Sequence, residues 1–191
     1  MRKIFLTISI ILFIFLSSFI IVLSTIGIET SRFNNIISNK IIEQNPEISL
    51  ELKRIKFKYD IKNFNLFLET KKPNINFKSL EIPIENLKIY LNFISVLKTK
   101  PKIDKINIES KEIHIDQLKK IIIKTKPSSL NSLITNRVTK GKILINLELY
   151  IGDNLSLKDF IARGYVKEID FKIDKSLIIR DIKFNFFADP S

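Results

Sequence analysis

Residues 4–28 contain no charged side chain, and this property constrains the fold of the chain more than any other. Arg2 and Lys3 precede the run, and Glu29 and Arg32 follow it. About 20 apolar residues in a helix cross the roughly 30 Å hydrocarbon core of a bilayer, and Ser and Thr side chains can hydrogen-bond to the preceding turn. Residues 4–28 are therefore predicted to form one transmembrane helix.

A cleaved signal peptide is the alternative interpretation of this run. The apolar region of a signal peptide has about 7–15 residues and ends at a small-residue site of the A-x-A kind. Here the run is longer, Leu23-Ser24-Thr25 fits such a site poorly, and the first alanine of the chain is Ala162. A retained anchor is therefore the preferred interpretation.

The basic residues that flank the anchor predict its orientation. Arg2 and Lys3 make residues 1–3 a cytoplasmic tail under the positive-inside rule, so the bulk of the chain lies outside the cytoplasm. Lys40, Lys53 and Arg54 follow the anchor, so the charge asymmetry is modest.

Residues 29–47 are predicted to contain an amphipathic helix. Five apolar side chains recur at helical spacing, with Thr30 or Ser31 as the cap at its start and Pro46 at its end. We prefer a helix that packs on the core, and a helix lying among lipid headgroups is the alternative. The predicted apolar face consists of Phe33, Ile36, Ile37, Ile41 and Ile42.

From Ile48 onward, apolar and polar side chains alternate with a period of two, which is typical of strands with one buried face. Strands are expected near residues 48–52, 55–61, 64–68, 75–84, 103–108, 141–151, 162–174 and 177–187, with Ile113 and Ile115 continuing in the opposite phase. Short helices are expected over 117–124, with Asp116 as the cap, and over 130–138. Residues 87–97 fit either a helix or a strand.

The expected fold class is β-rich (α+β): a curved antiparallel sheet over residues 48–191 with one to three short helices. The sheet would be an open groove, or would close as a barrel or sandwich, because a continuous apolar face must be covered. The strands predict the side chains that would line such a groove and face lipid. These candidates are Ile143, Ile145, Leu147, Leu149, Ile169, Phe171, Phe184 and Phe186.

Motifs that carry covalent chemistry are not found in the sequence. It has no cysteine, and its one histidine, His114, is expected to be an outward-facing polar residue. No zinc-ligand cluster or calcium loop occurs, and the acidic residues Glu109, Glu112 and Asp116 are interpreted as a solvated strand rim. We therefore expect no enzyme activity, no catalytic residues, no metal and no cofactor.

The net charge of +12 comes mostly from lysines that are scattered singly along the chain. Nucleic-acid-binding proteins favour arginine and a basic patch or stripe with aromatic residues interleaved. The sequence therefore favours attraction to anionic lipid headgroups over a nucleic-acid partner.

The order of these features resembles the N-terminal region of the AsmA-like envelope proteins, the group that includes TamB and YhdP. The order is a short basic tail, one span, an amphipathic helix and then amphipathic strands. The resemblance also rests on residues 82–89 (IPIENLKI), 93–97 (FISVL) and 103–108 (IDKINI). It implies a single-pass bacterial inner-membrane protein whose periplasmic β-groove binds or transfers phospholipid. Because those proteins are much longer, it also implies that this chain is the membrane-proximal part of a longer architecture.

A strong strand near the last residues predicts an open sheet edge, which proteins usually cover or charge. That edge is a candidate site for a partner chain. The alternative function is therefore a structural or scaffolding envelope protein with a closed β core that pairs with a partner chain.

Overall fold

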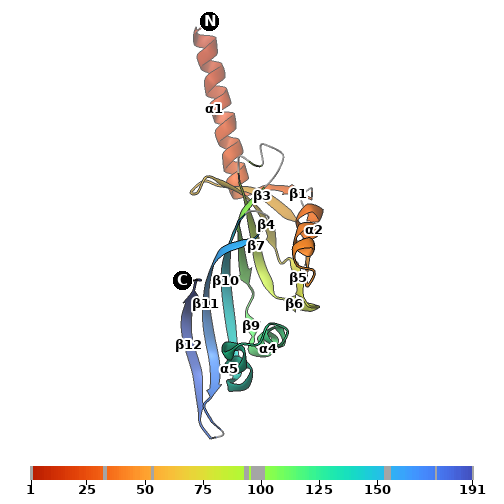
Figure 1. Ribbon diagram of the computed structural model, residues 1–191. Helices are drawn as coiled ribbons and strands as arrows, with labels where there is room; N and C mark the ends of the chain where they lie inside the picture. Colours follow the sequence, from red (N-terminus) through yellow and green to blue (C-terminus); the bar gives the residue numbers. More distant parts are fainter. Residues whose placement is uncertain are drawn as a thin grey trace.

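The apolar N-terminal segment forms helix α1 (Arg2–Thr25), which projects from one end of a large antiparallel sheet (Figure 1). The computed structural model describes residues 2–31, 34–52, 54–92, 95, 102–152, 156–174 and 176–190. The helix ends earlier than the predicted residue 28, because Gly27 has φ 75° and Ile28 begins strand β1 (Ile28–Thr30). Within α1, the hydroxyls of Thr7 and Thr25 donate to carbonyls four residues earlier, as expected.

The large sheet, sheet A, has nine strands in the order β1-β3-β4-β7-β8-β10-β11-β12, with β9 paired to β10. It is not closed into a barrel, so the open-sheet form of the predicted fold is confirmed. The bounds are β3 (Ile55–Asp60), β4 (Asn65–Lys71), β7 (Ile84–Leu91), β8 (Ile103–Ser110), β9 (Ile113–His114), β10 (Val138–Ile151), β11 (Leu157–Lys172) and β12 (Ile178–Ala188).

The register of sheet A aligns the apolar side chains of neighbouring strands into rows. Leu68 pairs with Ile89, Ile89 with Ile106, and Ile106 with Leu149. Because side chains alternate across a strand, all of these lie on one side, which we call the inner face. The strand period therefore produces one continuous apolar face across most of sheet A.

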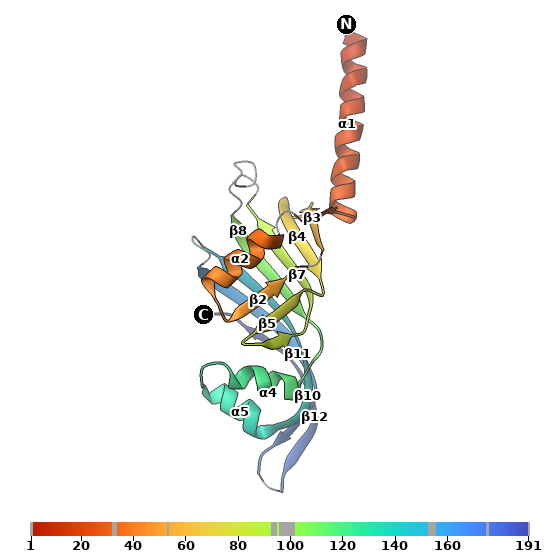
Figure 2. The same cartoon turned by 90° about the vertical axis from the view of Figure 1, so that its right-hand side faces the viewer.

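A second, smaller sheet covers part of the inner face. Sheet B contains β2 (Ile48–Glu51), β5 (Asn74–Phe77) and β6 (Leu80–Ile82), and it lies beside helix α2 (Asn34–Gln44) (Figure 2). The strand pattern did not predict that these strands form a sheet of their own. The two-residue turn Lys78-Ser79, in which both residues have positive φ, reverses the chain tightly and lets β6 pair with β5.

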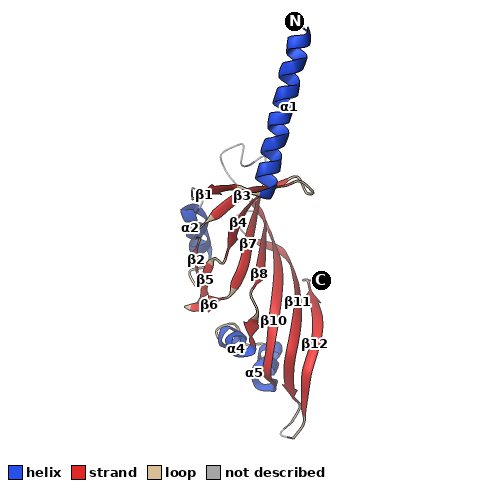
Figure 3. Ribbon diagram, turned by 180° about the vertical axis from the view of Figure 1, so that it is seen from behind, coloured by secondary structure: helices blue, strands red, loops and turns tan. Residues whose placement is uncertain are grey.

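Two short helices cover the other part of the inner face, farther from α1. Helix α4 (Ile115–Ile123) and helix α5 (Ser129–Arg137) lie on the same side of sheet A as α2 and sheet B (Figure 3). The Ser128 hydroxyl accepts a hydrogen bond of 3.1 Å from the backbone N–H of Asn131 and so caps α5.

Several local expectations need correction. Thr30 belongs to β1, and Ile115 begins α4 instead of continuing a strand. His114 occupies the cap position of α4, so Asp116 lies in the first turn, where its charge suits the helix dipole. Ile42 is exposed, so it does not share the buried face of α2.

Two strand boundaries also differ from those predicted, and three predicted residues lie outside the part of the chain that the structure describes. Residues 87–91 of the ambiguous segment belong to strand β7, because their apolar side chains pair in register with β4 and β8. The strand expected from Gly141 begins earlier, at Val138. The predictions for Phe33, Ile94 and Leu97 lie outside the described residues.

The buried apolar side chains form two clusters. The first lies between sheet A, sheet B and α2, and includes Ile37, Leu50, Ile55, Leu68, Leu87, Ile89 and Leu91. The second lies under α4 and α5 and includes Ile115, Val138, Val166 and Ile169. We call these parts the proximal half and the distal half, according to their position relative to α1 (Figure 1).

Candidate apolar groove

The eight side chains predicted to line a groove all lie along cavities on the inner face of sheet A. Ile145, Leu147 and Leu149 line one cavity. The other five residues, Ile143, Ile169, Phe171, Phe184 and Phe186, line a second. The strand alternation therefore identified the floor of both cavities, and the prediction that they face lipid stays a prediction.

The proximal cavity has a volume of about 370 Å³ and lies between sheet A and the cover made by α2 and sheet B. Apart from Ser110, its lining is entirely aliphatic or aromatic. The Ser110 hydroxyl accepts a hydrogen bond of 2.8 Å from the Ile145 N–H, so it already has a polar partner. All of its lining residues are buried or half-buried.

The distal cavity has a volume of about 540 Å³ and lies between sheet A and helices α4 and α5. Both volumes fall in the range of about 300–1,000 Å³ that is typical of small-molecule sites. Four of its large apolar lining residues are exposed: Leu130 and Leu133 on α5, and Phe184 and Phe187 on β12. Leu133 is 45% exposed and Phe184 is 48% exposed, so the distal cavity opens to solvent between α5 and the edge strand.

The two cavities meet at Ile113, which lines both. Above this junction, sheet B is bonded to helix α4: the Lys78 ammonium donates to the Lys124 carbonyl at 2.8 Å, and the Lys124 ammonium donates to the Lys78 carbonyl at 2.7 Å. These two bonds connect the elements that cover the two cavities. On the sheet side, β10 continues from Ile145 in the proximal cavity to Ile143 in the distal cavity. We call the two cavities together the apolar groove, because they share Ile113 and the same sheet face.

Two glycines let side chains lie flat on the floor of the distal cavity. A Cβ at Gly164 would come within 2.2 Å of the Phe186 ring, and a Cβ at Gly141 within 2.2 Å of Ile169 Cδ1. The close approach of each side chain to bare backbone requires glycine at that position. These contacts determine the shape of the distal floor.

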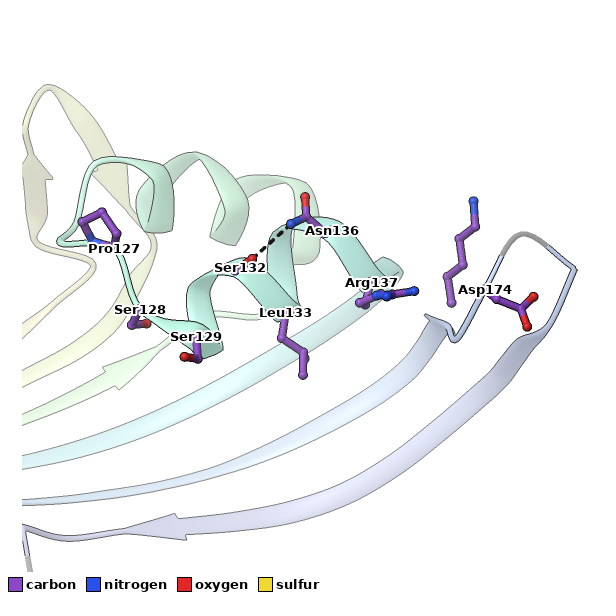
Figure 4. A pocket seen from close by; sticks show the side chains of 9 residues that line it. Pro127, Ser128, Ser129, Ser132, Leu133, Asn136, Arg137 and Asp174 are labelled. Atoms are coloured by element: carbon purple, nitrogen blue, oxygen red, sulfur yellow. Dashed lines mark hydrogen bonds between the residues drawn. The ribbon is translucent and has the colours of Figure 1, made fainter.

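A polar hollow adjoins the distal cavity on the outer side of α5 (Figure 4). Leu133 belongs to the lining of both, and in Figure 4 its side chain extends from α5 toward the strands. The Asn136 amide donates to the Ser132 hydroxyl at 3.2 Å, and Arg137 donates to the Ile173 carbonyl. The hollow is lined by Pro127, Ser128, Ser129, Ser132, Leu133, Asn136, Arg137, Lys172 and Asp174.

Asp174 carries a fixed negative charge at the rim of this hollow. Hydrogen bonds from the backbone N–H groups of Ser176 and Leu177 lower the pKa of its carboxyl group. Arg137 and Lys172 place positive charges in the same hollow. The hollow therefore offers partners for both signs of charge beside an apolar cavity.

The titratable groups near the apolar groove form ion pairs among themselves. Lys142 lines the distal cavity, but its ammonium is 3.3 Å from Glu112 and 3.3 Å from Glu168, and hydrogen bonds to Glu168 and Glu112 raise its pKa. Glu112 also accepts from Lys167 at 2.5 Å, and His114 is exposed. Among the residues that the structure describes, no cluster of His, Asp and Glu side chains could hold a metal ion.

Sequence reasoning predicted that the helix within residues 29–47 packs on the core, as α2 does through Ile37 and Ile41, but it did not predict that the helices line cavities. Ile41 on α2 and Leu130, Leu133 and Ile134 on α5 line the cavities from the helix side. Leucines three residues apart on a short helix predict an apolar face, but not the sheet face that this helix meets. No protein-family model matches this chain, and no curated protein or solved structure matches it.

Proposed function

We propose that the chain is a membrane-anchored envelope protein that binds phospholipid, with an acyl chain in the distal cavity and the headgroup in the polar hollow. One observation carries the proposal: an open apolar cavity and a polar hollow share Leu133 as their common wall. A ligand that fills both must be amphiphilic. The open sheet and the resemblance to AsmA-like proteins support the further step that the protein transfers phospholipid.

An acyl chain suits the distal cavity because its aromatic and aliphatic lining offers almost no hydrogen-bond partner. A polar group buried there would lose its hydrogen bonds to water at a cost of several kcal/mol. Each buried methylene group contributes about 0.8 kcal/mol in favour of binding. The cavity therefore selects hydrocarbon.

A phospholipid headgroup suits the hollow because its charges complement the residues there. A guanidinium has five N–H donors, and Arg137 uses one on the Ile173 carbonyl, so this side chain can also bind a phosphate oxygen. Lys172 adds a second positive charge, and the Asp174 carboxylate complements the amine of a zwitterionic headgroup.

Membrane anchoring by α1 is the second part of the proposal. The helix has 24 residues, so its length of about 36 Å is enough to cross the hydrocarbon core. Its large apolar side chains are exposed almost all the way along, and they are stable only in lipid or against another apolar surface. We place α1 in the bacterial inner membrane, with residues 1–3 in the cytoplasm and the sheet in the periplasm.

Photocrosslinking tests the lipid-binding proposal on the full chain in nanodiscs. Phosphatidylethanolamine with a diazirine in its acyl chain is expected to label residues of the distal cavity. Leu133→Asp should abolish most of this labelling, because it places a charge in the cavity wall. The matched control Ile123→Asp changes an exposed apolar residue of α4 that lies outside the cavity lining, and it should keep the labelling. Equal labelling of both variants would refute the site.

A scaffolding role is the second candidate, and the edge strand β12 favours it. This strand pairs only with β11 among the described strands, and Ile178, Ile179 and Phe187 on it are exposed. Such an edge can add a strand from a partner chain. Crosslinks from β12 to a stoichiometric protein partner, without labelling by lipid, would favour this role over lipid binding.

A further inference from the structure

The turn between β3 and β4, residues 61–64, presents apolar side chains to solvent. Phe64 is 74% exposed and Ile61 is 50% exposed, which is unusual for large apolar residues in a turn. Lys62 and Asn63 lie between them and are also exposed. The turn therefore has the composition of a membrane-interface contact, with apolar side chains and an exposed lysine together.

Asp60 holds the turn in one conformation. Its carboxylate accepts hydrogen bonds from the Lys62 N–H at 3.0 Å, the Asn63 N–H at 3.3 Å and the Asn63 side-chain amide at 2.8 Å. These bonds, the Asn63 side-chain bond foremost, lower the pKa of Asp60. Phe64 has φ 53°, which directs the chain back into β4. The exposure of Ile61 and Phe64 is thus built into an ordered turn.

The same hairpin is joined to α1 with almost no linker. Only Ile26 and Gly27 separate α1 from strand β1, which pairs with β3, with Ile28 opposite Phe57. Gly27 lies against β3 so closely that a Cβ there would come within 2.7 Å of Lys58 Cγ. Leu23, near the end of α1, is buried. Helix and hairpin therefore have a defined relative position.

This position puts the turn beside the C-terminal end of α1. The β3–β4 hairpin extends sideways at the level where α1 meets the sheet, as two opposite views show (Figure 1, Figure 3). Ile26 and Ile28, also exposed, lie in the connection from α1 to β1. A bilayer that α1 crosses would have its surface at this level.

We propose that residues 61–64 insert Ile61 and Phe64 into the interface of the leaflet from which α1 emerges, with Lys62 at the lipid phosphates. The inference rests on the proposed anchoring of α1 and does not depend on lipid binding in the groove. Two contacts, the helix and the turn, would then fix the tilt of sheet A against the membrane. The distal cavity would be held away from the bilayer.

Single-tryptophan fluorescence tests this contact directly, because the chain contains no tryptophan. The full chain with Phe64→Trp is reconstituted in phosphatidylcholine vesicles, with and without bromine on the acyl chains. The inference predicts blue-shifted emission and strong quenching by lipids brominated near the headgroup end of the chain. Phe13→Trp within α1 reports the span, and Ile123→Trp on α4 reports a site remote from the membrane (Figure 1).

The three variants separate the possible failures. Quenching at residues 13 and 64 but not at residue 123 supports the contact. Quenching at residue 13 alone, with the emission maximum of a water-exposed tryptophan at residue 64, refutes the contact of the turn with the membrane. It remains consistent with membrane anchoring by α1. Absence of quenching at residue 13 overturns the anchor and the contact together. Because each replacement keeps a large apolar side chain at an exposed position, folding should be preserved, and circular dichroism checks this.

Discussion

The proximal and distal halves of the apolar groove share one sheet but differ in how they are covered. In the proximal half, sheet B and α2 enclose the inner face, and side chains such as Leu68 are only 2% exposed. In the distal half, two short helices cover the sheet and leave Leu133 and Phe184 nearly half exposed. The floor has the same apolar alternation throughout, so the difference comes from the cover.

Because of this difference, we expect the two halves to contribute unequally to the stability of the fold. A well-covered apolar cluster contributes most of its transfer free energy to folding, whereas an exposed apolar wall contributes little. We therefore expect the proximal half to contribute more to stability than the distal half, where the proposed ligand would bind. The following predictions test this division, beginning with the largest effect.

Truncation of a core leucine should have the largest effect. Leu68→Ala in the proximal half is expected to lower the free energy of unfolding by about 2–5 kcal/mol, because it leaves a cavity in a closed core. Leu133→Ala in the distal half should cost less than about 1 kcal/mol, since its side chain is partly in water already. Urea unfolding followed by circular dichroism measures both. Equal losses would mean that the distal half is also a closed core.

A side chain at Gly164 should have an intermediate effect that is confined to the distal half. Gly164→Ala is expected to cost about 1–3 kcal/mol, because its Cβ would collide with the Phe186 ring and with the Leu144 carbonyl. Hydrogen exchange should show faster opening of β11 and β12, with β3 and β4 unchanged. Combining it with Phe186→Ala removes the ring contact, so the two losses should be less than additive. Strict additivity would contradict the ring contact.

Acid should weaken the proximal half slightly through the Lys58–Glu69 pair. Burial raises the pKa of Glu69, but the Lys58 ammonium at 2.6 Å, together with the Asn86 amide and Lys88, lowers the pKa below its ordinary value. A lowered folded-state pKa stabilises the protein above about pH 4.5, and this contribution is lost as the pH falls through the lower folded value.

We expect protonation of Glu69 to lower the free energy of unfolding by about 1 kcal/mol. Glu69→Gln should remove this part of the pH dependence in acid unfolding curves. The matched change in the distal half is Asp181→Asn on β12. It breaks an exposed ion pair in which the Asp181 carboxylate lies 3.1 Å from the Lys183 ammonium. It should shift stability less than Glu69→Gln does, because this pair is exposed and screened by solvent. A larger effect from Asp181 than from Glu69 would reverse the expected order.

Local pattern was enough to predict the strands that form the floor of the groove. Ile143, Ile145, Leu147 and Leu149 alternate along β10, and alternation alone puts them on one face. The short helices near residues 117–124 and 130–138 were also predicted within a few residues. The division into two sheets was not predicted. The pairing of β2 with β5 joins segments more than twenty residues apart, and a period of two does not indicate which strands pair.

The residues that cover the groove show why the site was only half predicted. Leu133 was expected on a short helix, but its place in the wall of the distal cavity depends on where α5 docks against sheet A. Gly164 carried no signal of its own, since only the register with Phe186 makes its missing side chain necessary.

The sequence by itself determined the apolar helix, the antiparallel strands and the apolar floor, because these follow from charge, length and period along the chain. Only the tertiary structure decided which end of that floor is covered and which is open. Covering depends on contacts between segments distant in sequence, such as those of sheet B and α5 with sheet A. The apolar run from which α1 was predicted is likewise local, whereas the placement of the β3–β4 turn beside it came from the pairing of β1 with β3.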